Sequence, residues 1–295
     1  MSISYKLAEN ICFAINSMPG KGIKGIMIKG AEVLADKDEL PRSLKQRDLC
    51  TKSQTFHGYT IHKLRAAWSK NASKKAVLFL PGGGGMTRAT ALHYDTARRI
   101  ALRTGADIFI VNYPLAPAHN VRFALDWLEN LYKAVLKKYD PQNLTLMGDS
   151  AGANLILSLT QRIEKKPGKL IVISPACGLE NGKNRNIRLA MEPHDPILSV
   201  KMNDVIAKYW CAGVELDSPD ISPEHVDYAG FPPMLLFYGT HELFYPHVLN
   251  YVDMLRASGV HFQEESQPMC HDWALCSFFP EGRRAIKKMA CYILK

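Results

Sequence analysis

The sequence lacks long hydrophobic runs. Its apolar stretches, such as residues 75–81 and 170–175, are interrupted by proline, glycine or charge well before the roughly 18 residues that a membrane-spanning helix needs. The N-terminus has only Lys6 ahead of a short apolar patch, without a clear small-residue cleavage site, so a secretory signal is not expected. We therefore predict a protein without a transmembrane segment.

Cysteines are few, and none are closely paired in the sequence. The seven cysteines include no Cys-x-x-Cys motif, which favours reduced thiols and a cytoplasmic location over a disulfide framework. Zinc is the competing interpretation for His241, His247, Cys270 and His271. Structural and catalytic zinc sites usually show tight pairs such as Cys-x-x-Cys or His-Glu-x-x-His, and the sequence has neither. No metal site is predicted.

Clustered positive charge is also lacking. Lysine and arginine total 37 against 28 acidic residues, a net charge of +9, but the basic residues occur as scattered pairs without aromatic neighbours. Nucleic-acid binding needs basic side chains gathered on one face, so no nucleic-acid partner is expected. The 47% hydrophobic content excludes a disordered chain and is typical of one large globular core.

What the sequence does contain is an alternation of short aliphatic runs and longer stretches with helical spacing. This alternation predicts an α/β protein in which helices flank a mostly parallel central sheet. The predicted strands are residues 76–80, 107–113, 144–147, 170–174, 234–238 and 260–267, and the predicted helices between them are residues 91–103, 121–139 and 151–164.

Two segments depart from this alternation. Residues 179–221 contain proline, asparagine, glycine and charge with one clear helical stretch, 201–212, and we interpret them as a cap inserted over the carboxyl ends of the strands. Residues 1–55 lack strand alternation, so we assign them to an N-terminal helical part of the cap. The catalytic domain is then expected to span residues 56–295.

Gly148-Asp149-Ser150-Ala151-Gly152 joins a predicted strand to a predicted helix. A serine on a sharp strand-to-helix turn has an exposed hydroxyl, and the flanking glycines permit the turn and close helix-to-strand packing. A glycine-rich turn with an incidental serine is the alternative. The strand and helix on either side favour Ser150 as a nucleophile.

Backbone donors for an oxyanion are predicted from two segments. The Ala151 N–H lies at a helix N-terminus, where the helix dipole favours an anion. Residues 82–85 are four consecutive glycines after a strand, and their missing Cβ atoms let the backbone approach a substrate closely. Of these we select Gly83 and Gly84. The loop does not match a phosphate-binding motif.

A serine nucleophile needs a histidine base and an acid to orient that base. On such sheets the order along the chain is serine, acid, histidine, so the partners should follow later strands. His271 follows the last predicted strand, and Glu242 is the one carboxylate near the end of the strand 234–238. Asp253 lies within a helical stretch, and Asp272 is adjacent to His271, where its side chain is badly placed to orient the ring.

Together these motifs resemble the α/β-hydrolase esterases of the hormone-sensitive-lipase-like family, from about residue 76 to the C-terminus. Residues 111–117 (VNYPLAP) resemble the family's Asp-Tyr-Arg-Leu-Ala-Pro segment, and residues 148–155 resemble its Gly-Asp-Ser-Ala-Gly-Gly-Asn-Leu. Phe231-Pro232-Pro233 ahead of a strand also fits. The resemblance implies the α/β-hydrolase fold and a lipase-like serine carboxylesterase without a cofactor.

Three positions depart from the family pattern. Pro81 stands where the family has the histidine of His-Gly-Gly-Gly, which removes a side chain that would brace the loop but leaves the backbone donors. Pro114 stands where the family has arginine. The acid is Glu242, whereas the family usually has aspartate, and the extra methylene changes the reach to His271. All three predicted triad members remain.

The expected activity is hydrolysis of small, short- to medium-acyl esters through a Ser150–His271–Glu242 triad and an acyl-enzyme. Amide, lactone or peptide hydrolysis could use the same residues. A ligand-binding receptor on a hydrolase scaffold is the alternative from another class, although such receptors typically lose the histidine. The expected partner is a small-molecule ester, and the sequence leaves a homodimer open.

Overall fold

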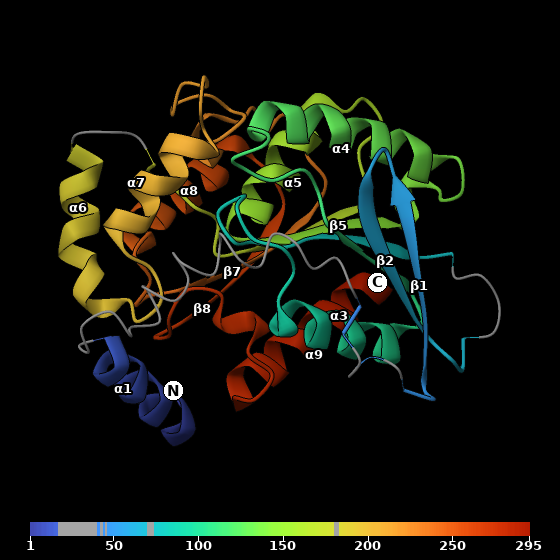
Figure 1. Cartoon of the computed structure of the whole chain (residues 1–295), viewed down its shortest axis with the longest axis horizontal. Helices are drawn as coiled ribbons and strands as arrows, with labels where there is room; N and C mark the ends of the chain where they lie inside the picture. Colours follow the sequence, from blue (N-terminus) through green and yellow to red (C-terminus); the bar gives the residue numbers. More distant parts are fainter. Residues whose placement is uncertain (17–39, 42–43, 45, 70–73, 180–182) are drawn as a thin grey trace.

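An eight-stranded sheet forms the centre of the molecule (Figure 1). The computed structural model describes residues 1–16, 40–41, 44, 46–69, 74–179 and 183–295. The strand order is β1-β2-β4-β3-β5-β6-β7-β8, in which β2 is antiparallel to β1 and to β4 and all other neighbours are parallel. The predicted mostly parallel sheet of the α/β-hydrolase fold is therefore confirmed. The strands are β1 (Leu49–Phe56), β2 (Tyr59–Ala66), β3 (Ala76–Leu80), β4 (Asp107–Val111), β5 (Leu144–Asp149), β6 (Lys169–Ile173), β7 (Met234–Gly239) and β8 (Phe262–Gln267).

Helices cover both faces of the sheet. Figure 1 shows α4 and α5 on one face and α3 and α9 on the other. The α-helices that the structure describes are α1 (Ile3–Asn16), α3 (Ala91–Thr104), α4 (Val121–Leu136), α5 (Ala151–Arg162), α6 (Lys183–Met191), α7 (Val200–Tyr209), α8 (Tyr245–Ser258) and α9 (Pro280–Leu294). Their ends follow local rules: Gly105 closes α3 in the left-handed conformation, and the Asn120 side chain accepts a hydrogen bond from the Phe123 N–H at the start of α4.

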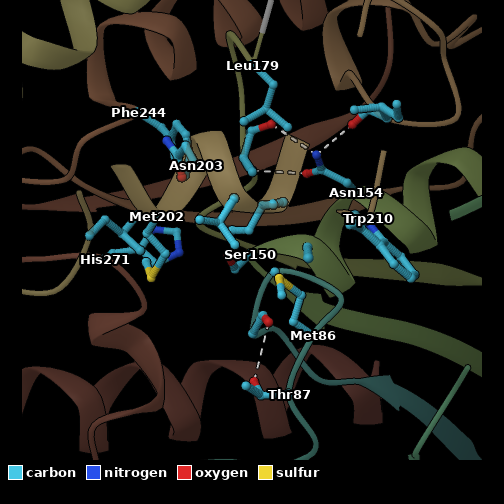
Figure 2. Close-up of a pocket in the computed structure, with 18 of the residues that line it drawn as sticks. Met86, Thr87, Ser150, Asn154, Leu179, Met202, Asn203, Trp210, Phe244 and His271 are labelled. Carbon is cyan, nitrogen blue, oxygen red and sulfur yellow. Dashed lines mark hydrogen bonds between the residues drawn. The ribbon is translucent and has the colours of Figure 1, made fainter. Parts of the chain in front are cut away.

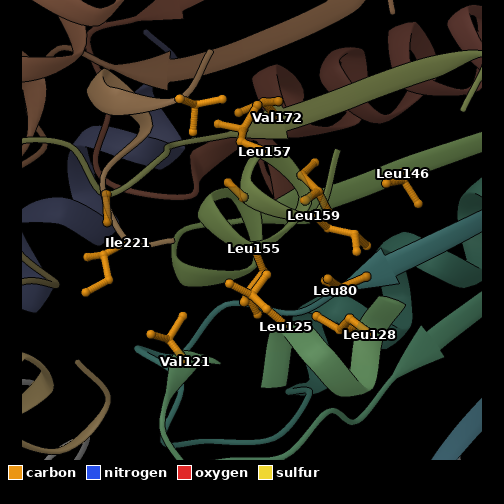
Figure 3. Close-up of a cluster of buried hydrophobic side chains, with 14 of the residues drawn as sticks. Leu80, Val121, Leu125, Leu128, Leu146, Leu155, Leu157, Leu159, Val172 and Ile221 are labelled. Atoms are coloured by element: carbon orange, nitrogen blue, oxygen red, sulfur yellow. The ribbon is translucent and has the colours of Figure 1, made fainter. Parts of the chain in front are cut away.

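The hydrophobic core lies on both faces of the sheet because the central strands are buried on both sides. All five residues of β3 and all five of β4 are buried, which is the continuous apolar pattern of parallel strands between two helical layers. Figure 3 shows one cluster, in which leucines of α5, including Leu155 and Leu159, pack beside Leu125 and Leu128 of α4. This packing fixes α5, and with it the turn that precedes its first residue.

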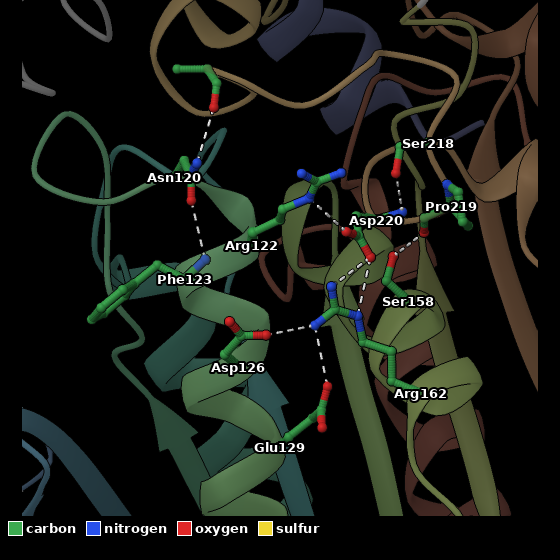
Figure 4. A network of polar contacts seen from close by, with 11 residues as sticks. Asn120, Arg122, Phe123, Asp126, Glu129, Ser158, Arg162, Ser218, Pro219 and Asp220 are labelled. Atoms are coloured by element: carbon green, nitrogen blue, oxygen red, sulfur yellow. Dashed lines mark hydrogen bonds and ion pairs between the residues drawn. The ribbon is translucent and has the colours of Figure 1, made fainter.

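A helical insertion separates β6 from β7. It contains α6 and α7, which lie together at one end of the sheet in Figure 1. Its last part is tied to the α4 and α5 layer by a polar network: Asp220 accepts hydrogen bonds from Arg162 and pairs with Arg122, and the Ser158 hydroxyl donates to the Pro219 carbonyl (Figure 4). The one clear helical stretch expected in this segment, residues 201–212, corresponds to α7, whereas α6 was not predicted from the sequence.

The N-terminal prediction is correct in one part and wrong in another. Residues 3–16 form the helix α1, whereas residues 49–55, also predicted to be helical, belong to strand β1. Residues 17–39 lie outside the described residues. The β1–β2 hairpin turns at His57 and Gly58, both with positive φ, as in a two-residue type I′ turn. The sequence did not predict β1 because it is an edge strand with mostly exposed polar side chains, which show no alternation of apolar and polar residues.

Among the described residues, no helix is both long enough and apolar enough to cross a bilayer.

Candidate active site

Ser150 lies on a strained turn between β5 and α5. Its φ and ψ angles are 50° and −122°, a conformation that a residue with a side chain adopts only when its surroundings impose it. The flanking glycines explain how the turn fits: a Cβ on Gly152 would stand 2.0 Å from the Leu80 carbonyl oxygen, and a Cβ on Gly148 would stand 2.3 Å from the Gly152 oxygen. The Ser150 N–H also donates to the Ile173 carbonyl at 2.9 Å. The strand, turn and helix thus hold the hydroxyl at the carboxyl end of the sheet.

The glycine loop after β3 needs its glycines. Gly83, Gly84 and Gly85 have φ angles of 109°, 64° and 67°. A Cβ on Gly84 would overlap the Ile206 side chain at 2.5 Å, and a Cβ on Gly85 would overlap the Trp210 ring at 2.1 Å. The loop is therefore packed under the cap helix α7, and Gly83, Gly84 and Ala151 line the same pocket as Ser150. Backbone donors and nucleophile meet in one place.

The loop is braced although Pro81 replaces the family histidine. Asp149 Oδ2 accepts the Gly82 N–H at 3.0 Å and also bonds His93 Nε2 at 3.1 Å. The Thr90 N–H donates to His93 Nδ1, so Nε2 carries the hydrogen that Asp149 accepts. On the other side, the Tyr113 hydroxyl donates to the Pro81 carbonyl at 2.7 Å. The sequence did not predict these roles: Tyr113 lies in the motif of residues 111–117 without any sign of its contact with Pro81, and His93 lies in no motif.

His271 and Glu242 come together at the ends of β8 and β7. His271 Nδ1 lies 3.2 Å from Glu242 Oε2, and both side chains are almost fully buried. The Phe244 ring packs edge-on against the imidazole, with 5.7 Å between the ring centroids. Burial is the main cause that raises the pKa of the Glu242 carboxyl, and its bond to His271 opposes that rise. The glutamate reaches the histidine ring despite its extra methylene.

Asp272 approaches the other nitrogen of the imidazole. Its Oδ2 lies 3.4 Å from His271 Nε2, and no hydrogen bond joins this nitrogen to Ser150 in the structure. Burial lowers the pKa of His271, but the nearby carboxylates, first Asp272 and then Glu242, outweigh burial and raise the pKa to about 10. From the sequence, Asp272 is not assigned as the acid that orients the ring, because it is adjacent to His271. In the structure it lies near Nε2, whereas Glu242 contacts Nδ1. The backbone of Asp272 is left-handed, with a φ angle of 58°.

Two further groups hold the loops that carry the acid and the base. Asp195, from the insertion, is fully buried and accepts the Leu243 N–H at 2.8 Å, next to Glu242 in the chain. The Ser174 hydroxyl accepts the Asp272 N–H at 3.1 Å. Neither residue lies in a motif that would identify it from sequence.

Helix α1 contacts both loops. The Tyr5 hydroxyl accepts the Cys270 N–H at 2.6 Å, beside His271, and donates to Glu9 at 3.0 Å. Glu9 in turn lies 3.2 Å from His241 Nδ1, beside Glu242. Because these partners are more than 230 residues apart in the chain, no local sequence pattern could identify the contacts.

Ser150, His271 and the glycine loop face one cavity of about 120 Å³, lined mainly by apolar side chains (Figure 2). The cap contributes Leu198, Met202 and Ile206 to the lining, and the sheet side contributes Ser150 and His271. An apolar cavity with a few convergent polar groups is the usual form of a small-molecule site. The structure thus brings together all six residues singled out in the sequence: five line the cavity, and Glu242 lies behind His271.

Known proteins resemble this chain in sequence and in fold. Residues 77–275 match the family model described as the α/β-hydrolase fold. An esterase of Acinetobacter venetianus is 26% identical over 227 residues, which cover 74% of each chain. The esterase LipU of Mycobacterium tuberculosis is 26% identical, covering 76% of this chain and 78% of its own. A crystal structure of EstE5 soaked with p-nitrophenyl butyrate is similar at a TM-score of 0.82 and 25% identity, covering 100% of this chain and 98% of that chain.

Proposed function

The chain belongs to the family of proteins with the α/β-hydrolase fold, and from this membership we propose that it is a serine carboxylic-ester hydrolase. Its relatives in Acinetobacter venetianus and Mycobacterium tuberculosis are named esterases, and one structural neighbour is an esterase of the bacterial hormone-sensitive lipase family. The predicted resemblance to that group is confirmed. The finer proposal is a Ser150–His271–Glu242 triad that acts on small, short- to medium-acyl esters.

One observation carries this proposal. Ser150, on its strained turn, lines the same apolar cavity as the glycine loop and His271. The Nδ1 atom of His271 contacts the buried Glu242 carboxylate. A nucleophile, backbone donors, a base and an orienting acid are the parts that acyl transfer requires.

In the acylation step, Ser150 Oγ attacks the ester carbonyl carbon while its proton passes to His271 Nε2. The negative charge that develops on the carbonyl oxygen is met by the N–H groups of Gly83, Gly84 and Ala151. Glu242 keeps Nδ1 protonated and stabilises the imidazolium. The carbon–oxygen bond to the alcohol then breaks, and the alcohol leaves with the proton that His271 returns.

In the deacylation step, His271 takes a proton from water, the resulting hydroxide attacks the acyl carbon, and Ser150 Oγ leaves with that proton. For both steps Nε2 must form a hydrogen bond to Ser150; in the structure it has no hydrogen-bond partner among the described residues, and Asp272 Oδ2 lies 3.4 Å from it. Catalytic hydrogen bonds commonly tighten only when substrate binds. The limited volume and apolar lining of the cavity favour short and medium acyl chains.

The proposal is tested with p-nitrophenyl esters from acetate to decanoate and with a fluorophosphonate probe. We expect turnover that peaks at short or medium chain length, and one covalent adduct per chain on Ser150. Ser150→Ala is the matched control and should give neither turnover nor adduct. Inactivity at every chain length together with an unlabelled Ser150 would contradict the proposal.

A further inference from the structure

The polar side chains that line the cavity are not equivalent. Both functions of the Asn154 amide are used: its nitrogen donates to the Ala176 and Ile221 carbonyls, and its oxygen accepts the Ala176 N–H. Thr87 donates its hydroxyl to the Gly83 carbonyl. Asp220 is held by Arg162 and Arg122, as described above. These three groups have structural partners and no unused donor that faces the cavity.

Asn203 is the exception. It lies in the first turn of α7, where its backbone N–H donates to the Ser199 carbonyl at 3.2 Å, and its residue surface is only 3% exposed. The side-chain nitrogen is buried and has no hydrogen-bond partner, yet the residue lines the cavity that holds Ser150 and His271 (Figure 2). Its neighbours in the lining are apolar, among them Met202, Ile206 and Phe244.

A buried donor without a partner is costly, typically about 1–3 kcal/mol, so native proteins rarely keep one without a use. An aliphatic side chain of the same size would fit α7 and the apolar lining without that cost. A bound molecule that places an acceptor at the Asn203 amide would offset this free-energy cost.

We propose that Asn203 is a specificity-determining residue that donates a hydrogen bond to an acceptor oxygen on the chain of the substrate. The inference rests on the proposed ester hydrolysis and refines its substrate class: esters whose acyl or alcohol chain carries an ether, keto or hydroxyl oxygen. For a hydrocarbon chain of the same length the amide stays unpaired, and such a substrate reacts more slowly. A site with a buried donor discriminates in this way because the wrong ligand leaves the donor without a partner.

The test uses pairs of esters in which one CH₂ is replaced by oxygen. For the acyl side the pairs are p-nitrophenyl methoxyacetate with butanoate, and p-nitrophenyl 3-methoxypropanoate with pentanoate. For the alcohol side the pair is 2-methoxyethyl butanoate with butyl butanoate. The measured quantity is kcat/KM for the oxygen-containing ester divided by kcat/KM for its hydrocarbon partner. This ratio is compared between the wild type and Asn203→Leu, so that the intrinsic reactivity of each ester cancels.

We expect at least one pair to show a ratio about tenfold lower in Asn203→Leu than in the wild type, and that pair identifies the side that carries the oxygen. Met202→Leu alters the neighbouring lining without changing its polarity, and it should keep the wild-type ratios. Because the mutation removes an unpaired buried donor, Asn203→Leu should also have a melting temperature equal to or above that of the wild type.

Equal ratios in the wild type and Asn203→Leu for all three pairs would overturn the inference while leaving ester hydrolysis intact. A melting temperature several degrees lower in Asn203→Leu, with unchanged ratios, would assign Asn203 a structural role. A wild type that hydrolyses none of the six esters and leaves Ser150 unlabelled by the fluorophosphonate would remove the proposed function, and this inference with it.

Discussion

The two halves of the site are held in different ways. The nucleophile half, with Ser150 and the glycine loop, stands on the adjacent central strands β3 and β5, and its backbone is fixed by close packing and by Asp149. The base half, with His271 and Glu242, stands on β7 and β8 at the edge of the sheet.

Contacts from distant parts of the chain hold the base half. Asp195 of the insertion binds the loop after β7, and Tyr5 of α1 binds the loop after β8. The carboxylates of Asp272, Glu242 and Asp195 lie near the imidazole, and their negative charges raise its pKa. The comparison shows that local backbone geometry builds one half of the site, whereas long-range contacts and charge build the other.

The largest effect is expected from removing the nucleophile. Ser150→Ala should lower kcat by about 10⁴-fold or more, because the oxyanion donors and the cavity remain but no acyl-enzyme forms. Steady-state hydrolysis of p-nitrophenyl butanoate, corrected for the spontaneous rate, measures this loss. Residual turnover within tenfold of the wild type would place the nucleophile elsewhere.

A smaller loss is expected from weakening the brace of the glycine loop. Asp149→Asn keeps the size of the side chain but removes the negative charge from Oδ2, the one oxygen that accepts from both Gly82 and His93, and so weakens both hydrogen bonds. Since removal of one oxyanion donor costs about 10²–10³ in kcat, we expect indirect displacement to cost about 10–10² with little change in KM. Steady-state kinetics of Asp149→Asn and of His93→Gln measure the effect. A wild-type kcat in both variants would show that the brace does not position the oxyanion donors.

The pH dependence of kcat/KM should come from the base half, because His271 changes its protonation state. The carboxylates beside His271, first Asp272 and then Glu242, raise its pKa above the ordinary value for histidine, so the neutral base form gains population as pH rises and activity should increase toward the alkaline side. Asp272→Asn removes the charge nearest Nε2, lowers that pKa and should move the rising limb of kcat/KM down by about one pH unit. Profiles from pH 5 to 10.5 measure it, and an unmoved limb would contradict the electrostatic account.

The smallest effect is expected in α1. Tyr5→Phe removes the acceptor for the Cys270 N–H and should lower kcat two- to fivefold and destabilise the protein by about 1–2 kcal/mol. Leu7→Ala changes an exposed position on the same helix and is the control for kcat. Urea unfolding and steady-state kinetics separate the two effects. If Tyr5→Phe alters stability but leaves kcat at the wild-type value, α1 supports the fold without positioning the base.

The same contrast explains what the sequence could predict. The elbow and the glycine run are local motifs whose backbone demands are visible in the residue types, so Ser150, Gly83 and Gly84 could be named in advance. The strands β3 to β7 were predicted because strands buried on both faces read as aliphatic runs.

What could not be predicted depends on tertiary contacts. Strand β1 is exposed and polar, and helix α6 (KNRNIRLAM) is so rich in charged and polar residues that it reads as a loop. The roles of Asp195, His93 and Tyr5 depend on partners far along the chain. Glu242 was chosen by chain order, and its contact with His271 became visible only in the structure.

Activation of Ser150 by His271 within one cavity can be tested directly by one measurement. The rate at which a fluorophosphonate labels Ser150 is followed by mass spectrometry across pH in the wild type and in His271→Ala. We predict one adduct per chain on Ser150, a rate that rises with pH in the wild type, and at least a 10³-fold slower, pH-independent rate in His271→Ala. Equal labelling rates in the two proteins, or an adduct on another residue, would contradict the account.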